Sequence, residues 1–122
     1  LCILLADQIS SSLLKPWVAR LRPTHNPEIA DLIHTVNGYR GGRYGFVSSH
    51  AANAATFVTF TALIFRNKIY TILLSLWAFF TAYSRVYLGV HYVGDVFCGA
   101  LIGLLVGIVI YIIFKKTLYF KL

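Results

Sequence analysis

The sequence has little charge, and negative charge is especially scarce. Only 12% of the 122 residues are charged, and Asp and Glu together number 4. With 58% hydrophobic residues, this composition falls outside that of ordinary soluble domains and indicates a membrane protein. The 11 Lys and Arg residues give a net charge of +7. Such an excess either anchors a chain at the inner leaflet or binds anionic groups.

Cysteine is scarce and methionine is absent. The two cysteines, Cys2 and Cys98, lie in apolar surroundings, which favours buried thiols over a disulfide. Residue 1 is not an initiator, and the chain opens within an apolar stretch that has no signal-peptide pattern. The length allows one domain at most. We therefore expect residues 1–122 to be a single membrane-embedded domain that lacks its N-terminal helices.

Four apolar stretches predict an all-α membrane bundle. Residues 1–14 resemble the end of a transmembrane helix whose polar residues, including Asp7, face other helices. Residues 48–65 and 69–84 predict two more helices, separated by a basic turn. Residues 96–114 carry no charge and approach the ~20 residues that a bilayer requires.

The long polar connection after the first stretch predicts one short helix. Residues 26–38 place Asn26 as an N-cap and Gly38 as a C-terminal stop, with apolar residues on one side. Such a helix would lie at the membrane surface.

The order of the spans places the charges on two sides of the membrane. Arg66 and Lys68 fall on the same side as the C-terminal lysines, which fits the cytoplasmic face. The remaining Lys and Arg residues fall on the other side, against the positive-inside rule. An anionic substrate on that side would explain them.

Residues 84–95 concentrate the polar chemistry, with the sequence SRVYLGVHYVGD. Arg85 is a permanent cation that suits forked contact with phosphate oxygens. His91 and Asp95 are four residues apart, so on a helix they share one face. The carboxylate can then hold one imidazole nitrogen and leave the other free to act as base or nucleophile.

Three segments together resemble the signature of the type 2 phosphatidic acid phosphatase superfamily, which includes lipid phosphatases, bacterial acid phosphatases and vanadium haloperoxidases. The first segment runs from Lys15 to Arg22, followed by proline, and the third is residues 84–95. The second reads Val-Ser-Ser-His at residues 47–50. The resemblance covers roughly residues 10–115, nearly all of the chain.

The sequence departs from the family pattern at two points. Val47 and Ser49 stand where the family usually has Pro and Gly, although Ser48 and His50 are kept. Loss of the glycine restricts the close approach of backbone to phosphate, and the Ser49 hydroxyl partly compensates. The family's lipid enzymes typically have six spans, whereas this chain supplies about four.

The resemblance implies a role for each polar residue of the three segments. His91 resembles a nucleophile that forms a phosphohistidine, and Asp95 orients it. His50 resembles the general acid for the leaving oxygen and then the base for water. The implied phosphate-binding residues are Lys15, Arg22, Ser48, Ser49 and Arg85. No metal or other cofactor is implied.

The implied function is hydrolysis of a phosphomonoester or diphosphate on a membrane lipid, at the outer face of a bacterial inner membrane. Candidate substrates are phosphatidic acid, phosphatidylglycerol phosphate, undecaprenyl diphosphate and a lipid A phosphate. The short spacing from Lys15 to Arg22 is more typical of general lipid phosphatases than of lipid A 1-phosphatases. The partners expected are the bilayer and the lipid substrate, and not nucleic acid.

Two alternatives remain open from the sequence. A haloperoxidase-like vanadate site is one, although the apolar spans argue against it because those enzymes are soluble. A non-catalytic membrane protein of the same fold is the other, and the altered second segment and the missing spans favour it.

Overall fold

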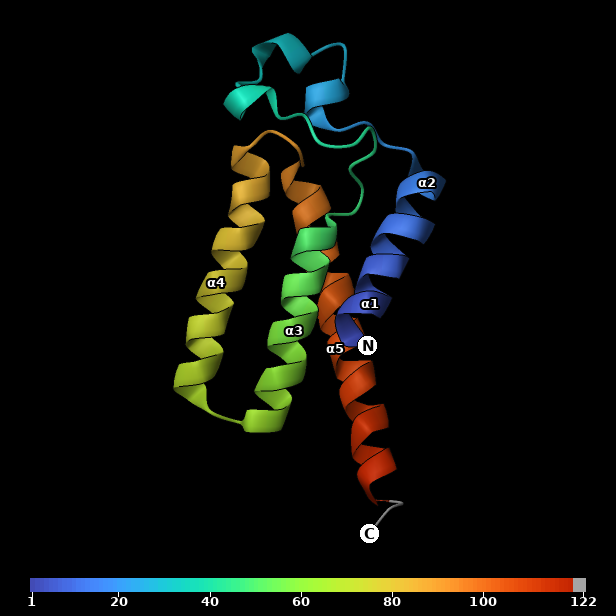
Figure 1. The fold of residues 1–122 in the computed structure, drawn as a ribbon, viewed down its shortest axis with the longest axis vertical. Helices are drawn as coiled ribbons and strands as arrows, with labels where there is room; N and C mark the ends of the chain where they lie inside the picture. Colours follow the sequence, from blue (N-terminus) through green and yellow to red (C-terminus); the bar gives the residue numbers. More distant parts are fainter. Residues whose placement is uncertain (120–122) are drawn as a thin grey trace.

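A computed structural model describes residues 1–119, which form an elongated helical bundle (Figure 1). The helices are α1 (Cys2–Asp7), a π-helical stretch (Gln8–Leu14), α2 (Lys15–Val18), α3 (Ser49–Phe65), α4 (Lys68–Tyr87) and α5 (Val93–Tyr119). The only β-pairing recorded in this described part is an isolated bridge between Leu21 and Tyr44. The all-α prediction is confirmed, and the predicted tail residue Lys121 lies outside the described residues.

The first three helical segments run on as one helix that packs against α3. Gln8 and Lys15, at the two junctions, both keep right-handed helical dihedral angles. Asp7 and Ser11 point toward α3, where Asp7 accepts a hydrogen bond from Asn53 at 3.4 Å. The prediction that this polar face packs on another helix is therefore correct. The helix ends at Ala19, whose φ of 51° is left-handed.

The bundle buries small side chains and exposes large apolar ones. Its buried apolar residues include Ala51, Ala52 and Ala54 of α3, whereas Phe79 and Phe80 of α4 are more than 60% exposed. This distribution is typical of helices that face lipid, because small residues let helix backbones approach each other. Two helices, α4 and α5, are long and apolar enough to cross a membrane, with mean hydropathy of 1.3 and 2.8.

Three glycines let α5 lie close against α3. Gly99, Gly103 and Gly107 recur every fourth residue, so they share one face of α5. A Cβ at Gly99 would lie 2.5 Å from the Ser48 carbonyl oxygen, and one at Gly107 would lie 2.8 Å from the Thr59 Cβ. The spacing was visible in the sequence, but its packing role was not predicted.

The long loop contains no α-helix, so the predicted interfacial helix over residues 26–38 is wrong. Two 3₁₀ turns, Ala30–Leu32 and Val36–Gly38, occupy this stretch instead. Asn26 does accept a hydrogen bond from the Glu28 amide at 3.1 Å, as a cap would. Helices this short are marginal unless tertiary packing supports them. Here the left-handed Asn37, with a φ of 51°, interrupts the predicted helix.

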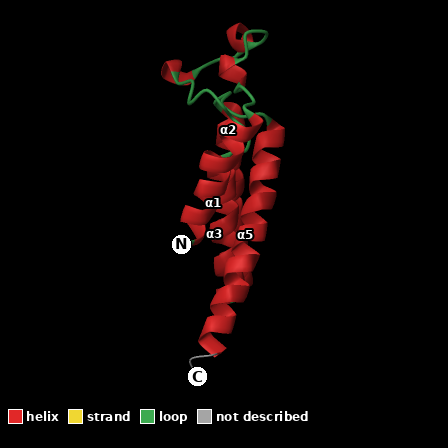
Figure 2. Cartoon of the chain, turned by 90° about the vertical axis from the view of Figure 1, so that its right-hand side faces the viewer, coloured by secondary structure: helices red, strands yellow, loops and turns green. Residues whose placement is uncertain are grey.

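The long loop lies at one end of the bundle, as both side views show (Figures 1 and 2). The N-terminal ends of α3 and α5 and the C-terminal ends of α2 and α4 reach the same end (Figure 1). The α3–α4 turn and the C-terminal end of α5 lie at the opposite end. The predicted division of the motif residues and the basic turn between the two ends is therefore correct.

The glycine face of α5 predicts the effect of added side chains. Gly103→Ala should destabilise the protein by about 1–3 kcal/mol, because the new Cβ meets the Ala52 carbonyl and the Ala55 side chain. Gly94→Ala is the matched control, since nothing lies within 4 Å of its new Cβ. Thermal unfolding in detergent measures both, and equal melting temperatures for the two variants would contradict this packing.

Candidate active site

The loop between α4 and α5 fixes His91 at the end of the bundle. The amides of Val90 and His91 both donate to the Arg85 carbonyl at 3.2 Å, which closes the end of α4. Gly89, with a φ of 67°, supplies the left-handed turn that this closure needs. His91 is 3% exposed, so its ring is held by its surroundings and not by solvent.

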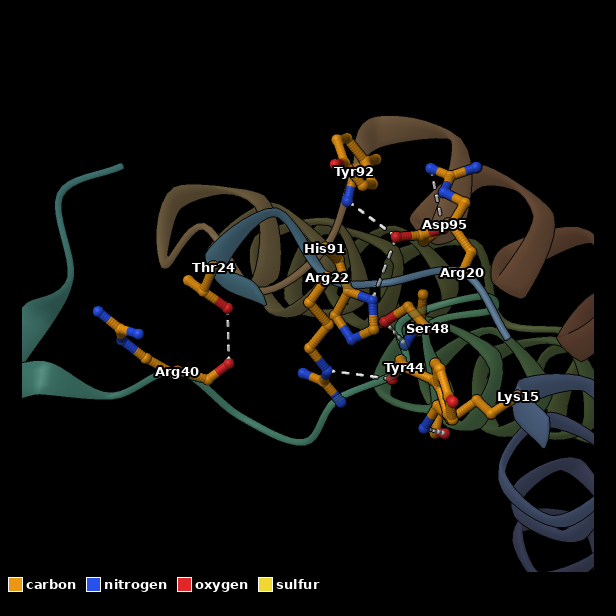
Figure 3. Close-up of polar contacts among 12 residues, drawn as sticks. Lys15, Arg20, Arg22, Thr24, Arg40, Tyr44, Ser48, His91, Tyr92 and Asp95 are labelled. Carbon is orange, nitrogen blue, oxygen red and sulfur yellow. Dashed lines mark hydrogen bonds and ion pairs between the residues drawn. The ribbon is translucent and has the colours of Figure 1, made fainter. Parts of the chain in front are cut away.

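Asp95 connects His91 to three other parts of the chain (Figure 3). Its carboxylate lies 3.6 Å from His91 Nδ1, accepts the Tyr92 amide at 2.9 Å and pairs with Arg20 at 3.1 Å. Its main-chain carbonyl accepts the Ser48 amide at 3.0 Å, which joins the second and third sequence segments. The carboxylate is fully buried, so these contacts replace its hydration. The predicted pairing of His91 with Asp95 is present, although 3.6 Å is longer than a hydrogen bond.

The start of α3 presents two serines with different roles. The Ser48 hydroxyl accepts a hydrogen bond from the Ala51 amide at 3.4 Å and so caps the helix. The Ser49 hydroxyl instead receives a hydrogen bond from Lys15 Nζ at 2.6 Å and lies 2.8 Å from the Ser11 hydroxyl. Ser49, which stands where the family has glycine, thus holds the Lys15 ammonium in place.

A cavity of about 340 Å³ opens beside these residues with cations on its walls. Its lining comprises Ser11, Lys15, Pro16, Arg22, Gly42, Arg43 and Tyr44. Arg22 Nε donates to the Tyr44 carbonyl at 3.1 Å, which fixes the guanidinium against the glycine-rich loop. Gly41 permits this approach, because a Cβ there would lie 2.5 Å from Arg22 Nη1. Three cations around one cavity suit a small anion.

His50 and Arg85 complete the cluster from α3 and α4. His50 lies in the first turn of α3 and Arg85 in the last turn of α4, and both of these helix ends reach the end of the bundle that carries the long loop (Figure 1). Arg85 Nε donates to the Ser84 hydroxyl at 3.2 Å.

The ring of His50 borders a second cavity, distinct from the cationic one. This space, about 330 Å³, lies between α1, α3 and α4 and is lined by His50, Asn53, Thr81 and apolar side chains.

The protonation state of His91 follows from its burial. Burial lowers the pKa of His91 below its ordinary value of 6.5, and Asp95 opposes this by favouring the charged ring. The cations of Arg22 and Lys15 lower the pKa further. The ring is therefore neutral at pH 7, the form in which an imidazole nitrogen can attack.

Two cations of the site, Arg20 and Arg43, do not belong to the polar residues of the sequence signature. Arg20 pairs with Asp95, and Arg43 lines the cationic cavity. Arg20 lies inside the first sequence segment, but its partner is far along the chain, so no local pattern indicates the contact. Across residues 1–119, no cluster of three or more His, Cys, Asp or Glu side chains is arranged to hold a metal ion. Cys2 and Cys98 are free thiols and form no disulfide, as predicted, but both are half-buried, whereas the sequence predicted buried thiols.

The hydrogen bonds of Ser49 predict its effect on anion binding. Ser49→Ala should weaken binding of orthovanadate about tenfold or more, because a hydrogen bond to a charged group is worth about 1.5–3 kcal/mol. Ser12→Ala is the control, since the Ser12 hydroxyl contacts only the Gln8 side chain on an exposed face. Isothermal titration calorimetry measures both affinities, and equal affinities would show that Lys15 does not depend on Ser49.

Comparison with known proteins agrees with the site. The family model described as "PAP2 superfamily" matches residues 1–119. The chain is 46% identical over 121 residues to a lipid A 4'-phosphatase of Porphyromonas gingivalis and 49% identical over 118 residues to one of Bacteroides thetaiotaomicron. These alignments cover 98% and 95% of the chain but only 49% and 52% of the relatives, so the chain spans about half their length.

A more distant relative and a solved structure agree with this assignment. Phosphatidylglycerophosphatase B of Bacillus subtilis is 32% identical over 81% of this chain and 48% of its own length. The crystal structure of Aquifex aeolicus LpxE matches 88% of this chain and 64% of that chain, with a TM-score of 0.64 and 32% identity. The apolar helices and these relatives indicate a membrane protein. The chain belongs to the PAP2 superfamily.

Proposed function

We propose that this protein hydrolyses a phosphate ester of a membrane lipid through a phosphohistidine on His91. The observation that carries this proposal is the cationic cavity of Lys15 and Arg22 beside the buried His91–Asp95 pair. The cations supply charge for the phosphoryl oxygens, and the pair supplies a neutral, oriented nucleophile. Membership of a phosphatase family supports the same chemistry.

The reaction would run in two displacements at phosphorus. In the first, His91 Nε2 forms a bond to phosphorus while the bond to the lipid oxygen breaks, and His50 gives its proton to that oxygen. Asp95 accepts the Nδ1–H and stabilises the positive charge on the phosphorylated ring. In the second, His50 takes a proton from water, the water oxygen attacks phosphorus, and the nitrogen–phosphorus bond breaks to release inorganic phosphate. Lys15, Arg22 and Arg85 would stabilise the charge on the oxygens throughout, with Ser48 and Ser49 at the start of α3 assisting.

The position of His50 supports an apolar leaving group. It borders both the cation cluster and the second cavity, whose walls include Phe57 and Trp77. A general acid must lie next to the oxygen that leaves, so the lipid portion of the substrate would occupy this second cavity.

Lipid A 4'-phosphate is the first substrate to test. The two relatives with this named activity are 46% and 49% identical over nearly the whole chain, whereas the phosphatidylglycerophosphatase is 32% identical. The short spacing of the first segment argued against a lipid A 1-phosphatase and does not bear on the 4' position. Phosphatidylglycerol phosphate is the second candidate.

The membrane arrangement that fits this function has four spans, with the site on the outer face of a bacterial inner membrane. The basic turn at Arg66 and Lys68 lies at the end opposite the site, where the positive-inside rule places the cytoplasm. Cations at the site end would then serve the substrate.

The proposed roles of the two histidines predict a graded loss of activity. His91→Gln should lower kcat by at least about 10³-fold, because it removes the nucleophile. His50→Gln should lower it by about 10²–10⁴-fold through loss of general acid–base catalysis. His34→Gln, an exposed loop histidine, should have no effect.

Phosphate release from lipid A, phosphatidylglycerol phosphate, phosphatidic acid and undecaprenyl diphosphate measures these rates. Equal phosphate release by His91→Gln and the parent protein would contradict a mechanism in which His91 is the nucleophile. No release from any of the four lipids would favour the non-catalytic alternative.

The lowered pKa of His91 predicts the acid limb of the pH profile. Burial keeps the ring neutral below pH 6.5, so kcat/KM should hold as the pH falls through 6.5 and decline only at lower pH. If kcat/KM had already fallen to half of its maximum before the pH dropped to 6.5, that result would contradict a buried neutral nucleophile. The profile is measured with one lipid in mixed micelles at constant ionic strength, since salt screens the cations.

A further inference from the structure

Arg20 holds the carboxylate on which His91 depends, from the opposite side. Its Nη2 lies 3.1 Å from Asp95 Oδ1, while the other carboxylate oxygen faces His91 Nδ1 at 3.6 Å. Figure 3 shows Arg20 and His91 approaching the same carboxylate from different directions. The carboxylate thus lies between a permanent cation and a titrating ring.

The Arg20 side chain is fixed by its surroundings. Its guanidinium lies 4.5 Å from the centre of the Tyr92 ring and 5.8 Å from that of Phe46, so it stacks while it pairs. The main chain is also held, because the Gly45 amide donates to the Arg20 carbonyl at 2.9 Å. Arg20 does not line the cationic cavity, so its position gives it no direct route to the phosphate.

A buried carboxylate without a countercharge is costly, and the cost falls when a cation pairs with it. Removal of Arg20 would leave Asp95 with His91 as its nearest cation-forming neighbour. The pair would then take up a proton more readily, and a protonated pair cannot supply a neutral imidazole backed by a carboxylate. Because Asp95 and His91 titrate together, the proton is taken up by the pair and is not assigned to either residue alone.

We propose that Arg20 is a positioning residue that pairs with Asp95, compensates its negative charge and thereby keeps the Asp95–His91 pair from taking up a proton, with His91 oriented for attack. It acts through Asp95 and does not contact the substrate. The other groups that face His91 are Arg22 from the long loop, Lys15 from α2 and the ring of His50 from α3. All of them remain in an Arg20 variant. Only the kinetic part of this inference rests on the proposed function.

The test compares Arg20→Gln, Arg20→Lys and Arg66→Gln in the full-length protein. Arg66→Gln removes the same charge at the C-terminal end of α3, in the α3–α4 turn at the opposite end of the bundle from the site (Figure 1), and serves as the control. ¹⁵N NMR of histidine-labelled protein, with the His91 signal identified by its loss in His91→Gln, follows the titration of the ring. Arg20→Gln should shift this titration to higher pH, Arg20→Lys should shift it less, and Arg66→Gln should leave it in place.

The kinetic readout separates positioning from a purely structural role. In Arg20→Gln the acid limb of kcat/KM should move to higher pH with the NMR titration. Its kcat should fall by about 2- to 150-fold, with KM little changed. This range corresponds to the interaction energies usually measured between residues of one polar network. A rise in KM at unchanged kcat would instead place Arg20 in phosphate binding and overturn the proposal.

The outcomes distinguish this inference from the proposed function. If the His91 ring titrates at the same pH in Arg20→Gln and in Arg66→Gln, the proposed role of Arg20 is overturned. This holds whether or not the protein releases phosphate. An upward shift without phosphate release by any variant supports Arg20 and refutes the phosphatase activity. If Arg20→Gln does not fold, the Arg20→Lys variant decides the question. A lysine ammonium cannot stack on the Tyr92 ring and pair with Asp95 at the same time, as the planar guanidinium does. An unshifted His91 titration and an unchanged kcat in Arg20→Lys would therefore overturn the proposal.

Discussion

The buried Asp95 carboxylate is the contact on which the arrangement of the site depends. Through side chain and main chain it contacts four residues from three separate parts of the chain: Arg20, Ser48, and the adjacent His91 and Tyr92. A fully buried anion must be compensated by partners, and here those partners come from the long loop, the start of α3 and the α4–α5 loop. One carboxylate therefore both assembles the end of the bundle and orients the proposed nucleophile.

Close packing of two helices brings these partners together. The glycine face of α5 lets it approach α3 until the Ser48 amide reaches the Asp95 carbonyl. The N-terminus of α3, with Ser48 as its cap, then lies beside His91, where its dipole favours an anion. Small residues in the bundle thus serve the site directly, while the large apolar residues face outward.

Much of the site could be predicted because its members lie in short local patterns. The four-residue spacing of His91 and Asp95 indicated that they lie close together, although His91 lies in the loop before α5 and does not share a helix with Asp95. Arg20 could not be assigned in this way, because its contact with Asp95 depends on how the loop folds back over α5. The helix expected at residues 26–38 failed for a related reason: its apolar spacing was helical, but the left-handed Asn37 broke the helix.

The central claim is that Lys15, Arg22 and Arg85 surround one phosphoryl group while His91 attacks it. A crystal structure with orthovanadate, which resembles phosphate in its transition state, tests this most directly. The account predicts vanadium bonded to His91 Nε2, with its oxygens in contact with the three cations. Vanadium bonded to another residue, or bound away from His91, would contradict it.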